Sequence, residues 1–210
     1  PNIANSVSLI KGTSQPPKNK RYDQFNLYKE ALRLVPEESI IGITGGEPTL
    51  LKDQLFLFLQ EILSERSDLF FHILSNAQHF EEDDRGVLSE MRNNILWGIP
   101  LYSADAQIHN QIVGKENAFD ILIDSFNDLF SAGVRIELRT VLLRQNVHEL
   151  PSIAEFIATH LHWIEVWAIM QLENIGYARL NWEQIFFDNS LDFSPIQRAI
   201  TVAAGRDVNV

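Results

Sequence analysis

The sequence predicts an α/β fold with a parallel sheet, arranged as a partial (β/α) barrel. Five apolar segments of strand length alternate with segments of helical length along the 210 residues. Each interval between strands is long enough for one helix, as a right-handed βαβ unit requires. Because a complete eight-stranded barrel takes about 250 residues, we expect a barrel that is incomplete at one or both ends. A doubly wound sheet is the alternative.

The expected elements follow from apolar spacing and from the residues that break it. The predicted strands are 40–43, 69–74, 95–102, 134–143 and 163–172. The predicted helices are 23–35, 51–63, 85–93, 117–131, 149–160 and 195–204, and 208–210 is expected to begin a further strand. Pro36 ends the predicted helix 23–35, and Gly133 ends the predicted helix 117–131. Pro151 is well placed in the first turn of the predicted helix 149–160.

Composition limits the domain organisation. Hydrophobic residues make up 45% of the chain, which is enough for one core, so residues 1–210 are expected to form a single domain. Within it, residues 1–22 are polar and loop-rich, and 23–210 hold the alternating helices and strands. The chain begins with Pro1 rather than Met, which indicates a fragment or a processed chain.

Charge and hydropathy exclude several classes of partner. The net charge is −11 and no basic stripe is present, which argues against nucleic acid. No apolar run is long enough to span a bilayer and no signal peptide is visible. We therefore expect a cytoplasmic protein without a membrane partner.

The turn after the first predicted strand is the strongest candidate site. Two glycines, Gly45 and Gly46, let the backbone turn sharply, and Glu47 follows as a lone acid that can hold a ligand ammonium. Ligands of parallel α/β proteins sit at the carboxyl ends of strands, where this turn lies. No Gly-Lys-Ser/Thr follows, so this is not a Walker phosphate loop. An ordinary turn with a solvated Glu47 is the alternative.

Polar residues also follow or lie near the ends of the other predicted strands. They are Ser75, Asn76, Ser103, Asp105, Arg139, Arg144, Gln171 and Glu173. Strand ends meet water and are often polar for that reason alone, so each residue taken singly is weak evidence. Together they favour a ligand-binding rim on one end of the sheet.

The string Gly45-Gly46-Glu47-Pro48-Thr49 resembles the GGEP motif of the radical S-adenosylmethionine (SAM) superfamily. The resemblance extends over most of residues 4–180: Leu74–Ala77 is similar to the end of the third strand, Leu101–Ala106 to the ribose motif and Ile175–Ala178 to a turn near the adenine. It implies that the Gly45–Thr49 turn binds the amino group of SAM's methionine part and that these strand ends also contact SAM. The implied SAM-binding residues are Gly45, Gly46, Glu47, Pro48, Ser75, Asn76, Ser103, Asp105, Arg139 and Gly176.

Within the superfamily, Ser14–Lys18 and Tyr102–Asp105 resemble the radical SAM maturase of the His-Xaa-Ser peptide-modification system. This resemblance implies a peptide-modifying maturase with SAM and a [4Fe–4S] cluster as cofactors. Its partners would be SAM and a peptide or protein substrate.

One departure from the family pattern concerns the cluster. Ala4, Ser8 and Lys11 stand in the frame of the family's CxxxCxxC motif, and the chain contains no cysteine. Neither alanine nor lysine replaces a thiolate ligand of an iron–sulfur cluster. We therefore expect no metal site and no cluster in this chain, which would make it inactive in reductive SAM cleavage. The cysteines were either lost naturally or removed.

Two other functions stay open. The chain could be a catalytically silent domain that binds SAM or a peptide. It could also be a cofactor-free hydrolase or isomerase that uses Glu47, Asp105 and His109, although no nucleophile–base pair is evident. Asp105 and His109 are four residues apart, which suits either a metal-binding helix face or a helix N-cap beside a surface histidine.

Overall fold

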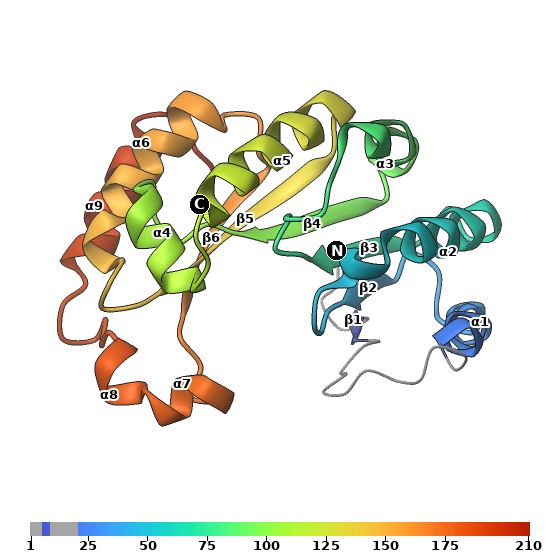
Figure 1. The fold of residues 1–210 in the computed structure, drawn as a ribbon, viewed down its shortest axis with the longest axis horizontal. Helices are drawn as coiled ribbons and strands as arrows, with labels where there is room; N and C mark the ends of the chain where they lie inside the picture. Colours follow the sequence, from blue (N-terminus) through green and yellow to red (C-terminus); the bar gives the residue numbers. More distant parts are fainter. Residues whose placement is uncertain (1–5, 9–20) are drawn as a thin grey trace. The chain divides into compact units, whose positions relative to one another are not determined.

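The computed structural model describes residues 6–8 and 21–210 (Figure 1). The chain divides into two compact units. Unit 1 comprises the residues up to Gly98 together with Ser125–Arg135, and unit 2 comprises Ile99–Asp124 and Ile136–Val210. None of the helices in the described ranges is long and apolar enough to cross a membrane.

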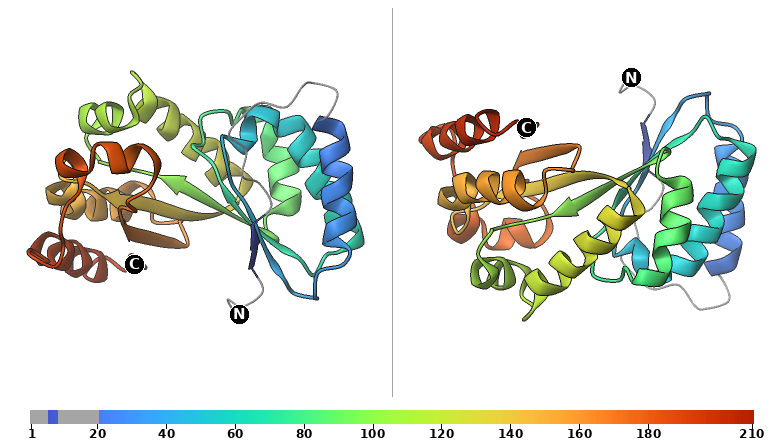
Figure 2. Two further views of the ribbon diagram at one scale, coloured as in Figure 1. Left: turned by 90° about the horizontal axis from the view of Figure 1, so that it is seen from below. Right: turned by 90° about the horizontal axis from the view of Figure 1, so that it is seen from above.

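Unit 1 is a parallel sheet covered by helices. Its strands are β1 (Ser6–Ser8), β2 (Ile40–Ile43), β3 (Phe70–Leu74) and the first part of β4 (Ile95–Pro100). They pair in sequence order, all in parallel. The helical elements are α1 (Arg21–Leu32), η3 (Pro48–Leu51), α2 (Lys52–Glu65), η4 (Glu82–Asp84) and α3 (Arg85–Met91). The views of Figure 2 show α1, α2 and α3 side by side.

Alternation along the strands builds the core of unit 1. The register places Ile41 beside Phe71 and Phe71 beside Ile95, so these side chains share one face of the sheet. All three are almost fully buried. The apolar face of α2, which includes Leu59 and Ile62, is buried as well, and burial of this kind is the main stabilising contribution to such a layer.

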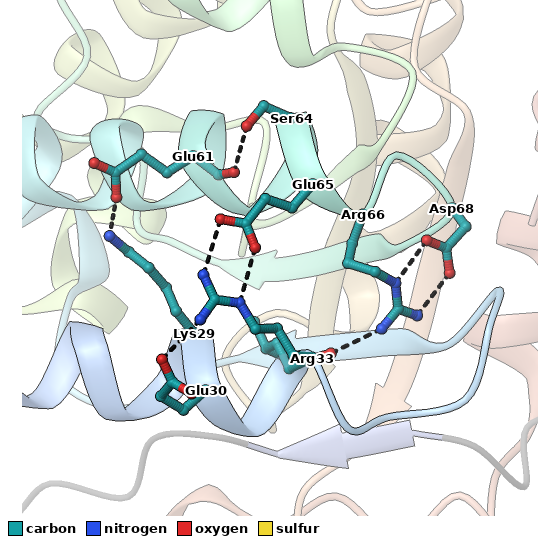
Figure 3. A network of polar contacts seen from close by, with 9 residues as sticks. Lys29, Glu30, Arg33, Glu61, Ser64, Glu65, Arg66 and Asp68 are labelled. Carbon is teal, nitrogen blue, oxygen red and sulfur yellow. Dashed lines mark hydrogen bonds and ion pairs between the residues drawn. The ribbon is translucent and has the colours of Figure 1, made fainter.

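A network of ion pairs joins α1 to the end of α2 (Figure 3). Lys29 pairs with Glu61, and the Arg33 guanidinium binds both carboxylate oxygens of Glu65 at 2.8 and 2.9 Å. Arg66 donates to the backbone carbonyl of Leu32, the last residue of α1, which has no helical partner there, and to that of Val35 in the segment that follows. The network therefore sets how the chain leaves α1 and enters β2.

Unit 2 holds the second part of the alternation. Its strands are the end of β4, β5 (Arg135–Leu142) and β6 (Val166–Gln171), and β5 and β6 pair in parallel. The helical elements are α4 (Ala106–Val113), η5 (Val147–Glu149), α6 (Leu150–His160), α7 (Gly176–Leu180), α8 (Trp182–Ile185) and α9 (Ser194–Ala204). Helix α5 (Ala118–Ala132) begins in unit 2, and its residues from Ser125 on belong to unit 1. Helices α6 and α9 pack against each other (Figures 1 and 2).

The core of unit 2 contains a fully hydrogen-bonded polar group. Thr140 of β5 is completely buried and donates its hydroxyl to the Leu101 carbonyl at 2.7 Å. The same hydroxyl oxygen accepts the Trp167 indole N–H at 2.9 Å. Because the Thr140 hydroxyl and the Trp167 indole both have partners, these bonds link β5 to β6 and to the segment after β4 and leave neither group buried and unpaired.

The predicted α/β class with parallel strands is confirmed. The five predicted strands and six predicted helices all occur, with ends that differ by a few residues from expectation. Three differences are corrections. Ser6–Ser8 forms β1, where only loop was expected, because its backbone pairs with β2. The short helices α7 and α8 follow β6, where the sequence analysis predicted no helix and the resemblance implied a turn at Ile175–Ala178.

The third correction concerns the end of the sequence. Residues 208–210 do not form a strand. The Trp167 N–H donates to the Asn209 carbonyl at 2.8 Å, and the Asn209 side chain donates to the Glu165 carbonyl at 3.0 Å. These bonds hold the segment beside β6 but do not amount to a ladder, since strand pairing needs a repeated backbone pattern.

Candidate functional site

The turn after β2 adopts a conformation that requires glycine. Gly45 has φ 103° and Gly46 has φ 54°, both in the left-handed region that other residues rarely occupy. A Cβ at Gly46 would have no heavy atom within 4 Å. Gly46 is therefore needed for its backbone conformation and not for lack of space, and the turn brings Glu47 to the carboxyl end of β2.

Glu47 is the centre of a network that ties the ends of β2 and β3 together. Four donors from the described residues reach its half-buried carboxylate. Oε1 accepts the Thr49 N–H at 3.0 Å, the Thr49 hydroxyl at 2.6 Å and the Ser75 hydroxyl at 2.8 Å. Oε2 accepts the Asn76 N–H at 2.6 Å. Hydrogen bonds to a carboxylate are stronger than neutral ones, so this acid fixes the geometry of both loops.

The loop after β3 is ordered by its own side chains. The Ser75 hydroxyl oxygen accepts the Ala77 N–H at 3.0 Å, and Asn76 Oδ1 accepts the Gln78 N–H at 3.0 Å. Ala77 has φ 57° and is fully buried, so a residue with a Cβ occupies the left-handed conformation here. These contacts place Ser75 and Asn76 at Glu47, as the sequence analysis expected for neighbouring strand ends.

A cleft of about 480 Å³ opens beside this corner in unit 1. It is lined by residues 49–54 and 78–81. Lys52 crosses one side, where its ammonium donates to Glu81 at 2.6 Å, to Asp84 at 3.0 Å and to the His79 carbonyl at 3.2 Å. Burial opposes the charged form of Lys52, but the bonds to Glu81 and Asp84 outweigh it and its pKa is raised. Lys52 therefore stays a cation and holds the 79–84 segment against α2.

In unit 2, Asp105 caps helix α4. Its Oδ1 accepts the Gln107 N–H at 2.8 Å and the Ile108 N–H at 3.1 Å, and the Ser103 hydroxyl oxygen accepts the Asp105 N–H at 2.9 Å. This is the N-cap arrangement, which satisfies backbone donors of the first turn. Asp105 and Ser103 are thus held together locally, and Asp105 is exposed.

His109 on α4 is a buried neutral side chain. It is 2% exposed, its Nδ1 accepts the Tyr102 N–H at 3.3 Å, and its ring lies near those of Tyr102 and Phe119. Burial lowers the pKa of His109 from its usual 6.5 to about 4. The surface histidine considered in the sequence analysis is therefore wrong, because the amphipathic face of α4 turns His109 inward. Within residues 6–8 and 21–210 there is no group of three metal-ligating side chains.

Arg139 and Gly176 occupy different surroundings in unit 2. The Arg139 guanidinium pairs with Glu137 on the same strand at 3.0 Å and donates to the Met170 sulfur of β6 at 3.0 Å. Gly176, with φ 53°, begins α7 and is exposed. Arg139 is thus already partly neutralised by Glu137, a partner that sequence spacing alone did not single out.

The structure therefore brings together Glu47, Ser75 and Asn76 within unit 1, and Ser103 with Asp105 within unit 2. Pro48 occupies the first turn of η3 beside Glu47. Sequence reasoning missed Thr49 as a partner of the acid. Its signal was present, since a hydroxyl two residues after an N-capping acid can bond back to it. Of the cluster-frame positions, Ala4 and Lys11 lie outside the described residues, and Ser8 is described only as part of β1.

Comparison with known proteins gives a family match. The sequence model described as the radical SAM superfamily matches residues 10–157. No curated protein matches the chain. Among solved structures, the chain is similar to SuiB of Streptococcus suis bound to S-adenosylmethionine, with 15% identity and a TM-score of 0.66 over 97% of this chain and 44% of SuiB.

Two further structures show the same fold. A domain of pyruvate-formate lyase-activating enzyme from Bacteroides vulgatus ATCC 8482 shares 14% identity, with a TM-score of 0.60 over 80% of this chain and 94% of that domain. The enzyme anSMEcpe with bound AdoMet and a Kp18Cys peptide shares 17% identity, with a TM-score of 0.52 over 72% of this chain and 42% of that one. The chain spans less than half the length of SuiB and anSMEcpe.

Proposed function

Because this chain belongs to the radical SAM superfamily, we propose that it is a SAM-binding domain that also engages a peptide or protein. Glu47 is the proposed anchor for the SAM ammonium, with Gly45, Gly46 and Pro48 shaping the turn around it. Ser75 and Asn76 complete this corner. The peptide part of the proposal is supported by anSMEcpe, which was solved with both AdoMet and a peptide.

The observation that favours SAM binding is the unequal use of the two Glu47 oxygens. Among the described residues, Oε1 accepts from three donors and Oε2 from one. Each oxygen of an ionised carboxylate offers about two acceptor positions, so Oε2, with one described donor, keeps capacity for a ligand N–H group. An ammonium placed there would gain a charge-assisted hydrogen bond.

Other SAM contacts are proposed from the family resemblance. In unit 2 they are Ser103, Asp105, Arg139 and Gly176. The resemblance of Ser14–Lys18 and Tyr102–Asp105 to the His-Xaa-Ser maturase makes a peptide of that kind the proposed substrate class. In family terms this would be a peptide-modifying maturase.

The residues of this chain do not fit a [4Fe–4S] cluster. The sequence contains no cysteine, and the proposed equivalents of the cluster ligands are Ala4, Ser8 and Lys11. Such clusters are held by thiolates, which these side chains cannot provide. We therefore propose a binding role for the chain as written, without reductive cleavage of SAM.

Calorimetric titration with SAM tests the binding role. The ion pair to Glu47 at a wet strand end contributes about 0–1 kcal/mol, so we expect a dissociation constant on the order of millimolar, equivalent to about −4 kcal/mol. Glu47→Gln should weaken binding by about threefold, which is a loss within that range. The matched control is Glu37→Gln, which alters an exposed carboxylate before β2. Micromolar binding that Glu47→Gln leaves unchanged would rule out this turn as the SAM site.

Anaerobic reconstitution with iron and sulfide tests whether the chain is unable to hold a [4Fe–4S] cluster. After desalting, the unaltered chain should retain no stoichiometric iron or sulfide. A variant with Ala4→Cys, Ser8→Cys and Lys11→Cys, and with Gly12 and Thr13 deleted, should recover part of the cluster absorption if the proposed frame is correct. Stoichiometric iron and sulfide on the unaltered chain would show that other groups hold a cluster.

A further inference from the structure

We infer that Thr49 and Ser75 are positioning residues that occupy Oε1 of Glu47 and so reserve Oε2 for the ligand ammonium. This inference rests on the proposed SAM site and adds to it the reason why one oxygen, and not the other, receives the ligand. Neither side chain is required to touch the ligand. Their effect passes through the carboxylate of Glu47.

The first step of the argument is saturation of Oε1. The Thr49 hydroxyl donates to it at 2.6 Å and the Ser75 hydroxyl at 2.8 Å, in addition to the Thr49 backbone N–H at 3.0 Å. A carboxylate oxygen has two lone pairs, so three donors among the described residues already fill it. A ligand N–H group therefore finds its acceptor on Oε2.

The second step is that both hydroxyl protons have a fixed direction. The Ser75 oxygen accepts the Ala77 N–H at 3.0 Å, which leaves its own proton to be donated to Glu47. The two hydroxyl oxygens of Thr49 and Ser75 are 3.5 Å apart, at the limit of a hydrogen bond, so each donates to the carboxylate in preference to the other. Because both residues are at most 4% exposed, water does not compete freely for these protons.

The third step is orientation of the carboxylate plane. The two hydroxyls hold Oε1 of Glu47, and the Asn76 N–H holds Oε2 at 2.6 Å. The Glu47 side chain therefore cannot rotate without breaking its hydrogen bonds to Ser75 and Asn76, which follow β3. The ligand then binds an acceptor that is already oriented, which lowers the ordering cost of binding. Loss of either hydroxyl would free the carboxylate to turn.

The test compares SAM with 5′-methylthioadenosine, which keeps the adenosine and a neutral thioether sulfur but lacks the aminocarboxypropyl chain and therefore the ligand ammonium. NMR titrations use the whole chain and its Thr49→Val, Ser75→Ala and Thr49→Ser variants. Ser64→Ala is the matched control, because Ser64 donates only to the Glu61 carbonyl of its own helix among the described residues. We expect Thr49→Val and Ser75→Ala to bind SAM about two- to threefold more weakly, no more weakly than Glu47→Gln does, and to bind 5′-methylthioadenosine as the unaltered chain does. Thr49→Ser should restore SAM binding, and Ser64→Ala should change neither.

The outcomes separate this inference from the proposed function. Equal weakening for both ligands, or no weakening for SAM, would overturn the positioning role while leaving SAM binding at Glu47 in place. SAM binding that is indifferent to Glu47→Gln would instead overturn the proposed site itself. Unchanged binding of 5′-methylthioadenosine also shows that each variant is folded, so loss of SAM affinity cannot be attributed to unfolding.

Discussion

Two acidic residues, Glu47 in unit 1 and Asp105 in unit 2, occupy equivalent places in the chain. Each follows a strand, and each is an N-cap whose side chain accepts backbone N–H groups of the next helical segment. The side chain of Asp105 accepts from residues two and three positions ahead. Glu47 also accepts from Ser75 and Asn76, which are 28 and 29 residues away.

The difference shows that one local signal can have two structural outcomes. A short acidic side chain at Asp105 reaches only its own helix, whereas the longer side chain of Glu47 reaches the end of the neighbouring strand. Asp105 is therefore a local cap. Glu47 is a tertiary link between β2 and β3, and the proposed ligand site is built on that link.

The largest expected effect is a loss of folding stability when Glu47, the tertiary link between β2 and β3, is replaced. Glu47→Ala should lower the free energy of unfolding by about 3 kcal/mol, because it leaves several donors without their charged acceptor. Urea unfolding followed by circular dichroism measures this. Glu37→Ala is the control and should change the free energy by less than about 0.5 kcal/mol, as is usual for exposed sites. A loss at Glu47 no larger than at Glu37 would mean that the network adds no stability.

The second effect concerns His109, which lies one turn after Asp105. Its pKa is lowered by burial from 6.5 to about 4 in the folded chain. Between these values the unfolded chain binds a proton that the folded chain does not, so stability falls as the pH decreases from about 6.5 towards 4. His109 should account for about 2 kcal/mol of that loss between pH 7 and 4.5.

The control for this effect is His109→Asn, which keeps an acceptor near the Tyr102 N–H but does not titrate in this range. Urea unfolding of both proteins at several pH values gives the difference. The pH profile of the variant should be flatter over this interval. Parallel profiles would show that His109 takes up its proton without cost, contrary to its burial.

The smallest effect is on the local cap. Asp105→Ala should cost about 1 kcal/mol, because the first turn of α4 loses one acceptor for two N–H groups. Asp105→Asn should be almost neutral, since asparagine caps helices as well as aspartate does. Thermal or urea unfolding of the two variants decides this. If Asp105→Ala cost as much as Glu47→Ala, the distinction between a local cap and a tertiary link would fail.

The sequence by itself determined the alternation of strands and helices, the left-handed diglycine turn before Glu47, and the absence of any thiolate for a cluster. These features depend on neighbouring residues or on composition, so a linear pattern contains them. It also predicted that Ser75 and Asn76 would lie at a strand end near Glu47, because parallel strands in sequence order bring their carboxyl ends together.

Only the tertiary structure decided how these groups use one another. That Oε1 of Glu47 takes the Thr49 and Ser75 hydroxyls, that Arg139 pairs with Glu137, and that His109 faces inward all depend on register, helix rotation and side-chain direction. A shift of one residue in a strand turns every side chain to the opposite face. Hydrogen bonds between residues 28 positions apart therefore follow from packing, and spacing along the chain does not specify them.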